Sequence, residues 1–246
     1  MPHSWEDALQ KYRYPVNLHE FVDAHDHSGW FNRNLETGDR KQTMQFEEYF
    51  RAHGREEIEP WYEVVFWKMY SQPSRRDNAT RRVVMHLQNR VVSPEEIWGA
   101  CFAYVKHAGR MSFDAFRRLF GFTTSVIATV ASFLAFIAPD EYPMVDTRVA
   151  RWVQCSFEAH NIADPHGPQL VPPRHPNAHT RVLTMADFEF VESWTNWCRY
   201  AALKLSNRTP TKWRARDVEM AVFQAWGRNG PHPNIHLNPL TNNDHV

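Results

Sequence analysis

A long stretch without charge near the middle of the chain limits the fold most strongly. Residues 119–139 contain no Asp, Glu, Lys or Arg, and residues 125–138 read SVIATVASFLAFIA. A helix of this length nearly suffices to cross a bilayer. Gly121 and several Thr and Ser residues dilute the stretch, however, and no second stretch of this kind accompanies it. We therefore predict a helix buried on all sides in a protein core, and no membrane partner.

The composition fits a folded protein of one large domain or two small lobes. A chain of 246 residues, 43% of them hydrophobic, can bury a sizeable core, which excludes a disordered protein. The cysteines Cys101, Cys155 and Cys198 form no CxxC pair, which indicates a reducing cytoplasm rather than a disulfide framework. They also cannot supply the four thiolates of an iron–sulfur cluster, and we expect no cofactor.

Proline and capping residues divide the chain into helices. Pro60 precedes WYEVVFWKMY, where proline suits the first helical turn, and Ser93 is followed by proline and two acids, a typical helix start. The many prolines of residues 163–178 predict an irregular connection. Because no segment alternates as a strand would, we predict an all-α fold. The expected helices cover residues 5–12, 44–53, 60–70, 79–89, 112–119, 125–138, 147–160, 186–205 and 215–226, with another starting at Ser93.

Two basic segments lie within a chain of zero formal net charge. The charged positions of residues 68–118 are mostly Lys and Arg, and residues 199–216 contain basic residues but no acid. Such segments form the electrostatic footprint of a polyanion, or they are solvated helix faces. Both interpretations remain open from the sequence.

Residues 112–152 carry the pattern that says most about function. They predict a helix, a tight turn at Gly121, the buried helix, and a loop that ends in Asp146 directly before another helix. This order resembles the HhH-GPD superfamily of DNA glycosylases, in which a hairpin reading like LPGVG precedes a closing motif often reading FPVVDTHVxR. Residues 119–123, LFGFT, match the hairpin without its second Gly, and residues 142–151, YPMVDTRVAR, match the closing motif. The resemblance implies two helical lobes with a cleft between them.

A hairpin of this kind is suited to hold a phosphate. It ends at a helix N-terminus, where unpaired backbone N–H groups and the positive dipole end face the ligand. Such contacts fix the register of DNA without reading its sequence. The residues that we expect to contact DNA in this region are Gly121, Thr123, Thr124, Ser125 and Arg148.

Asp146 is the candidate catalytic residue. Its place before a helix favours a negative charge, and a carboxylate there can stabilise an oxocarbenium-like sugar cation and orient water toward C1′. Asp is also a favoured N-cap, so capping alone is the alternative. Bifunctional relatives carry a Lys shortly after the hairpin that forms a Schiff base, whereas the first Lys after residue 123 in this chain is Lys204. The resemblance therefore implies a monofunctional glycosylase without lyase activity.

Residues 55–87 carry a narrower resemblance, to the phage-associated α-glutamyl/putrescinyl thymine pyrophosphorylase branch of the superfamily. Trp61 after Pro60 matches the start of its long helix, and the sequence RRDN at 75–78 matches a downstream cluster. Gln72 is either the wedge that fills the gap left by an extruded base or part of a surface turn. The resemblance implies a base pocket formed by Trp61, Tyr70, Asp77 and Asn78, and DNA contacts made by Gln72, Arg75 and Arg76.

The sequence thus predicts a monomeric DNA glycosylase that extrudes and excises a modified pyrimidine from double-stranded DNA. The phage resemblance also implies a cytoplasmic protein of bacteria or phage-infected cells. Its role would be anti-phage defence or phage DNA modification. The alternatives are a non-catalytic DNA-binding or scaffold protein of this fold and a base-modifying pyrophosphorylase-type enzyme. We expect a glycosylase domain at 55–228 between a helical segment at 1–54 and a loose polar tail at 229–246.

A metal site is the remaining alternative that the sequence raises. Histidines cluster at two places, but no pair has the spacing of a known zinc motif. We therefore expect no metal ligands. The clustered residues are His19, His25, Asp26 and His27, and then His160, His166, His175 and His179.

Overall fold

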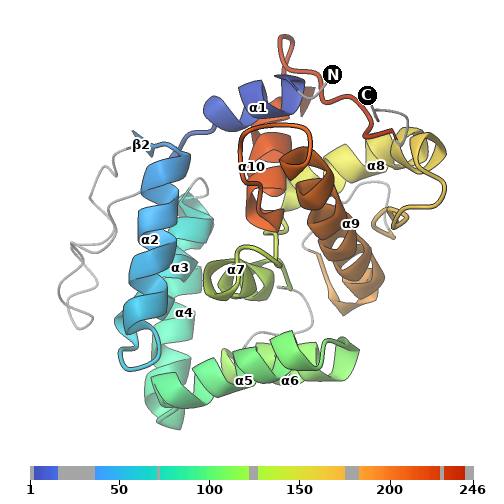
Figure 1. The fold of residues 1–246 in the computed structure, drawn as a ribbon. Helices are drawn as coiled ribbons and strands as arrows, with labels where there is room; N and C mark the ends of the chain where they lie inside the picture. Colours follow the sequence, from blue (N-terminus) through green and yellow to red (C-terminus); the bar gives the residue numbers. More distant parts are fainter. Residues whose placement is uncertain are drawn as a thin grey trace. The chain divides into compact units, whose positions relative to one another are not determined.

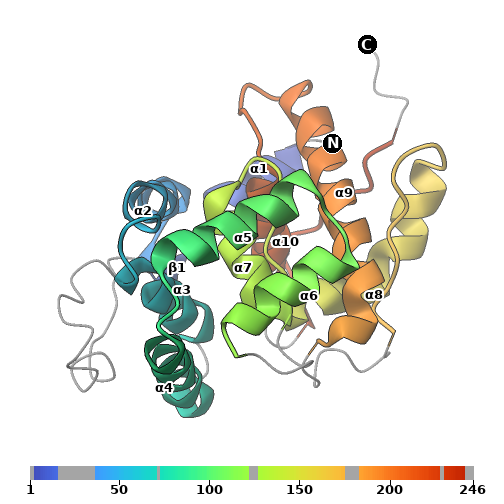
Figure 2. The same ribbon diagram turned by 90° about the horizontal axis from the view of Figure 1, so that it is seen from below.

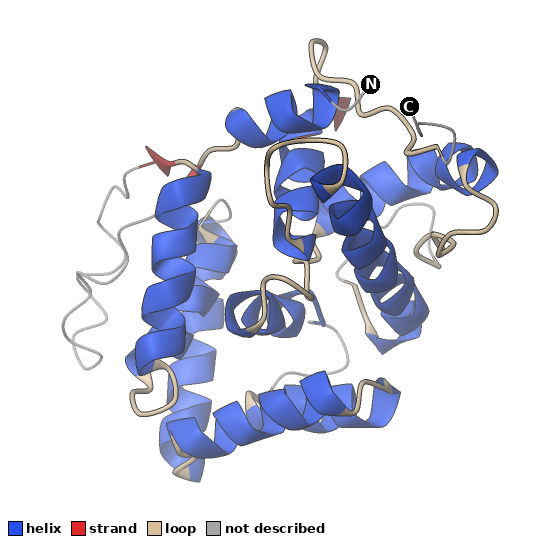
Figure 3. Cartoon of the chain, viewed as in Figure 1, coloured by secondary structure: helices blue, strands red, loops and turns tan. Residues whose placement is uncertain are grey.

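The computed structural model describes the backbone of residues 3–15, 37–70, 73–121, 127–174, 183–227 and 230–241, and, within these ranges, all side chains except those of His3, residues 73–80 and Gln88. The described residues are mostly helical, with only four strands of two residues each (Figures 1 and 3). The predicted all-α class is therefore confirmed. Within these residues, no helix combines the length and the apolar character needed to span a membrane.

The chain forms two compact units that are not consecutive in sequence. Unit 1 comprises Met1–Tyr12, Ser125–Ala131 and Ala138–Val246, and unit 2 comprises Arg13–Thr124 and Ser132–Ile137. The central apolar helix α7 (Ile127–Ile137) supplies residues to both, and its residues are buried except for the half-buried Ala128. The prediction of a buried apolar helix is confirmed.

Unit 2 consists of five further helices, of which α3 packs on α4 and α5 packs on α6. Figure 2 shows α5 and α6 side by side. Two short strands pair as well, β1 (Tyr14–Pro15) and β2 (Thr37–Gly38). The helices of unit 2 are α2 (Arg40–His53), α3 (Glu59–Met69), α4 (Pro73–Arg90), α5 (Pro94–Lys106) and α6 (Arg110–Leu119).

Capping chemistry explains where these helices begin. Ser93 caps α5, as predicted, by accepting a hydrogen bond from the Glu96 N–H. Asp39 and Gln42 form a capping box, so α2 begins at Arg40, before the predicted residue 44. The predicted break at residues 71–78 is too long. Pro73 already starts α4, because its fixed φ suits the first helical position.

Aromatic rings fill the core of unit 2. Trp61 and Trp67 of α3 are fully buried and pack on rings of α7, Trp61 against Phe133 and Trp67 against Phe136. The indole of Trp61 donates a hydrogen bond of 2.7 Å to the carbonyl of Gly54. These contacts satisfy the polar N–H inside an apolar core, as a buried tryptophan requires.

A carboxyl group of α3 lies in this apolar interior. Glu63 of α3 is 1% exposed, and its Oε2 has no hydrogen-bond partner among the described residues. Burial, reinforced by the charges of Glu59 and then Glu57, raises the pKa of Glu63 to about 8. The protonated acid is therefore the form that the fold favours near neutral pH.

We expect this acid to make the stability of unit 2 decrease as the pH rises. The folded pKa is raised, so the stabilisation is complete below the unfolded pKa and is lost as the pH passes through about 8. Between about pH 5 and about pH 9, urea unfolding should lose roughly 4 kcal/mol from this group. Glu63→Gln should remove that loss, whereas the exposed control Glu48→Gln should keep it. Equal pH dependence in wild type and Glu63→Gln would refute the assignment.

Unit 1 is built on helices α1 (His3–Gln10), α8 (Thr147–Ala163), α9 (Phe188–Ser206) and α10 (Ala215–Ala225), the short 3-10 helix η1 (Met185–Asp187) and the paired strands β3 (Trp226–Gly227) and β4 (Gly230–Pro231). Helix α1 lies against α10, and α9 packs beside α10 (Figure 1). The imidazole of His160 is buried against the rings of Trp152 and Trp197. This burial lowers the pKa of His160 to about 4.

The expected loose tail is partly packed on unit 1. Ile235 and Leu240 are buried, and the carbonyl of Asn238 accepts a hydrogen bond of 3.0 Å from the indole of Trp5. Arg208 also donates to the carbonyl of Thr241. The prediction was therefore wrong for residues 230–241, because two isolated apolar side chains are enough to anchor a polar segment.

Candidate active site and DNA-binding elements

Asp146 lies where the chain enters α8. Its backbone is extended (φ −147°, ψ −179°), and its Oδ1 accepts a hydrogen bond of 2.8 Å from the N–H of Val149. The residue is therefore an N-cap, as one sequence interpretation expected. Among the described residues, no donor bonds the second carboxylate oxygen, Oδ2. One oxygen therefore caps the helix, and the capping contact does not use the other.

The loop before Asp146 is fixed by side chains of α9. The indole N–H of Trp194, which is fully buried, donates a hydrogen bond of 3.0 Å to the carbonyl of Met144, two residues before Asp146. Arg199 donates to the carbonyl of Glu141 at 2.8 Å, and its guanidinium lies 4.8 Å from the ring centre of Tyr142. These contacts hold the loop on a rigid helix, so Asp146 emerges from a defined backbone.

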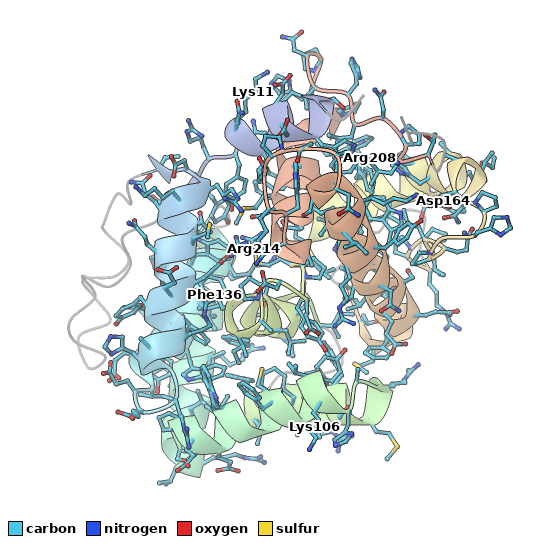
Figure 4. All side chains as sticks on the ribbon, in the orientation of Figure 1. Lys11, Lys106, Phe136, Asp164, Arg208 and Arg214 are labelled. Carbon is cyan, nitrogen blue, oxygen red and sulfur yellow. The ribbon has the colours of Figure 1, made fainter. Side chains whose placement is uncertain are left out.

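The start of the same loop is held by the first turn of α10. The N–H groups of Ala215 and Arg216 donate to the carbonyls of Asp140 and Pro139 at 3.1 and 3.0 Å. These amides would otherwise lack partners, because the first amides of a helix have none within it. Arg214, at this end of α10 in Figure 4, forms a capping box with Asp217. Helices far apart in the sequence therefore determine where Asp146 lies.

Arg148 follows Asp146 in the first turn of α8. Its guanidinium carbon lies 4.1 Å from the ring centre of Phe223 in α10, a cation–π contact, and the side chain is half-buried. This contact orients the guanidinium near the start of α8. A DNA contact of Arg148 stays a prediction.

The predicted hairpin begins with a true left-handed turn. Helix α6 ends at Leu119, and Gly121 has φ +66°. A Cβ at this position would lie 2.4 Å from Nδ1 of His86 in α4, so glycine is required by both conformation and space. The hydroxyl residues predicted to contact phosphate, Thr123, Thr124 and Ser125, lie outside the described residues.

We expect Gly121→Ala to be strongly destabilising for two separable reasons. The positive φ costs about 1–2 kcal/mol for any L-residue, and the clash with His86 adds to it. In a His86→Ala background the clash disappears, so the cost of Gly121→Ala should fall to about 1–2 kcal/mol. Gly99→Ala in α5, where a Cβ meets nothing, is the control and should be neutral or stabilising. An identical cost in both backgrounds, measured by urea unfolding, would contradict this packing.

The residues predicted for the base pocket and for the DNA contacts around it differ in burial within unit 2, and the structure describes only some of their side chains. Trp61 is fully enclosed in the aromatic core, so neither ring face is open to a base. Tyr70 follows the last turn of α3, partly exposed, with its ring 6.2 Å from that of Phe66. Gln72 lies outside the described residues, as do the side chains of Arg75, Arg76, Asp77 and Asn78, whose backbone forms the start of α4.

The basic segment 199–216 has a structural role that neither sequence interpretation anticipated. Four of its six cations pair with acids outside the segment: Arg199 with Glu141, Lys204 with Asp164, Arg214 with Asp217 and Arg216 with Glu219. Arg216 is fully buried and Arg214 nearly so. Much of the charge of this segment is therefore paired within unit 1, and its role as a footprint for DNA stays a prediction.

The described residues contain no group of three His, Cys, Asp or Glu side chains that could hold a metal ion. Of the clustered histidines, His160 is enclosed by tryptophans and His166 is exposed. The others lie outside the described residues, namely His19, His25, His27, His175 and His179, together with Asp26.

Comparisons with known proteins give no relative. No family model matches the chain, and no curated protein and no solved structure is similar enough to count as a match. The resemblance to HhH-GPD glycosylases therefore rests on the residues of this chain alone.

Proposed function

We propose that this protein is a monofunctional DNA glycosylase of the HhH-GPD type that removes a modified pyrimidine from double-stranded DNA. The observation that carries the proposal is the hydrogen bonding of the Asp146 carboxylate. One of its oxygens caps α8, the other has no partner among the described residues, and the motif around it resembles that of the superfamily. A carboxylate held this firmly is preorganised for electrostatic catalysis.

The chemistry requires little from the protein beyond this carboxylate. The enzyme extrudes the target nucleotide from the duplex, and the C1′–N bond breaks with its electrons leaving on the base. Asp146 stabilises the sugar cation and accepts a proton from the water that adds to C1′. The products are a free base, which is protonated by solvent, and an abasic site.

Unit 1 supports this role for Asp146 through its rigidity. The loop is anchored by Trp194 and Arg199 from α9 and by the first turn of α10. A catalytic group must be held within a fraction of an ångström, and sites built on helices achieve this better than free loops. The phage-type resemblance favours a bulky pyrimidine, and hence a role in phage DNA modification or anti-phage defence.

The direct test is the formation of alkali-labile sites. The protein is incubated with duplexes that carry either ordinary bases or a bulky substituent on one pyrimidine, and strand cleavage is scored after alkali. We expect cleavage only at the modified nucleotide and only after alkali. Binding without alkali-labile sites in any duplex would favour the non-catalytic alternative.

We also expect no covalent adduct with DNA. No Lys follows the predicted hairpin until Lys204, whose Nζ contacts Asp164 at 2.5 Å in a largely buried pair. Sodium borohydride should therefore trap no protein–DNA complex, because trapping needs a Schiff base between an amine and C1′. Efficient trapping would show that an amine attacks the sugar and would refute the monofunctional mechanism.

A further inference from the structure

One face of α4 carries cations next to the turn that follows α6. Arg82, His86 and Arg90 are spaced four residues apart, so their side chains share one face of the helix. Gly121 lies directly against the ring of His86. Burial, and next the charge of Arg90, lowers the pKa of His86, so Arg90 lies near this ring. The turn at Gly121 is therefore flanked by two arginines of α4. Arg82 lies one helical turn before His86, and Arg90 lies one helical turn after it.

Among the described residues, no acid pairs with either flanking arginine. Both side chains are exposed, and no described residue forms an ion pair or hydrogen bond with either of them. The neighbouring Arg117 and Arg118 of α6, by contrast, both pair with Asp114. Arg82 and Arg90 thus keep their guanidinium donors available to a ligand.

We propose that Arg82 and Arg90 bind two separate phosphates of duplex DNA, one on each side of the turn at Gly121. The inference rests on the proposed function, because it takes DNA as the ligand, and it assigns the phosphate contacts to one face of one helix. Eight residues of α-helix span about 12 Å, so the two guanidinium groups reach different phosphates rather than sharing one. Arginine suits this role because its planar fork matches the oxygens of a phosphate.

The salt dependence of DNA binding tests the proposal. Binding of the full-length protein to a fluorescein-labelled duplex of ordinary bases is followed by anisotropy over a range of salt concentrations. Each phosphate contact contributes about 0.9 to the slope of log K against log salt. The double variant Arg82→Ala with Arg90→Ala should therefore flatten the slope by roughly two units. The control Lys11→Ala with Lys41→Ala removes the same charge from two exposed lysines and should keep the wild-type slope.

The possible failures are distinguishable. If the wild type binds the duplex and the arginine variant keeps its slope, the assignment of these phosphates is overturned while the proposed function stands. If both double variants flatten the slope equally, the effect is one of net charge and the assignment is again overturned. If the wild type does not bind duplex DNA at all, the proposed function fails together with this inference.

Discussion

Asp146→Asn should lower the rate of base release by at least about a thousandfold, while the affinity for DNA changes by no more than a few fold. The amide has the size of the carboxylate and caps a helix about as well, so α8 should keep its N-terminus. The amide carries no negative charge, however, and cannot balance a sugar cation or take a proton from water. The rate is measured by single-turnover base release and the affinity by anisotropy.

A second N-cap in the same chain provides the matched control. Asp39 caps α2 in the same manner, by accepting from the N–H of Gln42. Asp39→Asn should leave base release unchanged, which separates the capping role of an aspartate from its charge at the active site. Full turnover by Asp146→Asn would refute the catalytic assignment.

Glu219→Ala should be the most destabilising single substitution in unit 1. Glu219 pairs with Arg216 inside α10, and both side chains are essentially without exposure. Removing the acid takes the charged partner away from a buried guanidinium, which also donates to the hydroxyl of Tyr12 at 3.4 Å. The expected loss is about 3–5 kcal/mol of unfolding free energy. Because the N–H of Arg216 also holds the carbonyl of Pro139, base release should decline as well.

The control for Glu219→Ala removes both charges. Arg216→Met with Glu219→Leu replaces the pair by apolar side chains of similar volume and should recover most of the lost stability. Urea unfolding of the two variants gives the comparison. If the double variant is as unstable as Glu219→Ala, the loss comes from packing and not from an unpaired charge.

The sequence predicted the helices best where local chemistry decides them. Ser93 as a cap and the uncharged stretch of α7 are local signals, and the structure agrees with both. The position of Asp146 directly before α8 could also be predicted, because Asp followed by Thr is a favourable helix start. The early starts of α2 and α4 were missed, since a capping box and a first-turn proline extend a helix beyond its apolar pattern.

Contacts between distant segments could not be predicted. Trp194 binds the carbonyl of a residue 50 positions away, and nothing in its local sequence distinguishes it from the other tryptophans. Arg199 and Lys204 resemble part of a basic surface because their acidic partners, Glu141 and Asp164, lie far away in the sequence. The sequence does show the four-residue spacing of Arg82, His86 and Arg90, which predicts that they share one helix face. The packing of His86 on Gly121, however, could be seen only in the structure.

The mass of the DNA after reaction tests the central claim most directly. A duplex with one bulky modified pyrimidine is incubated with the wild-type protein, and the intact strands and the released small molecules are analysed by mass spectrometry. Our account predicts a strand that has lost the modified base and gained a hydroxyl group, together with the free base in solution. A strand of unchanged mass with protein bound, or one that has gained mass on the base, would contradict it.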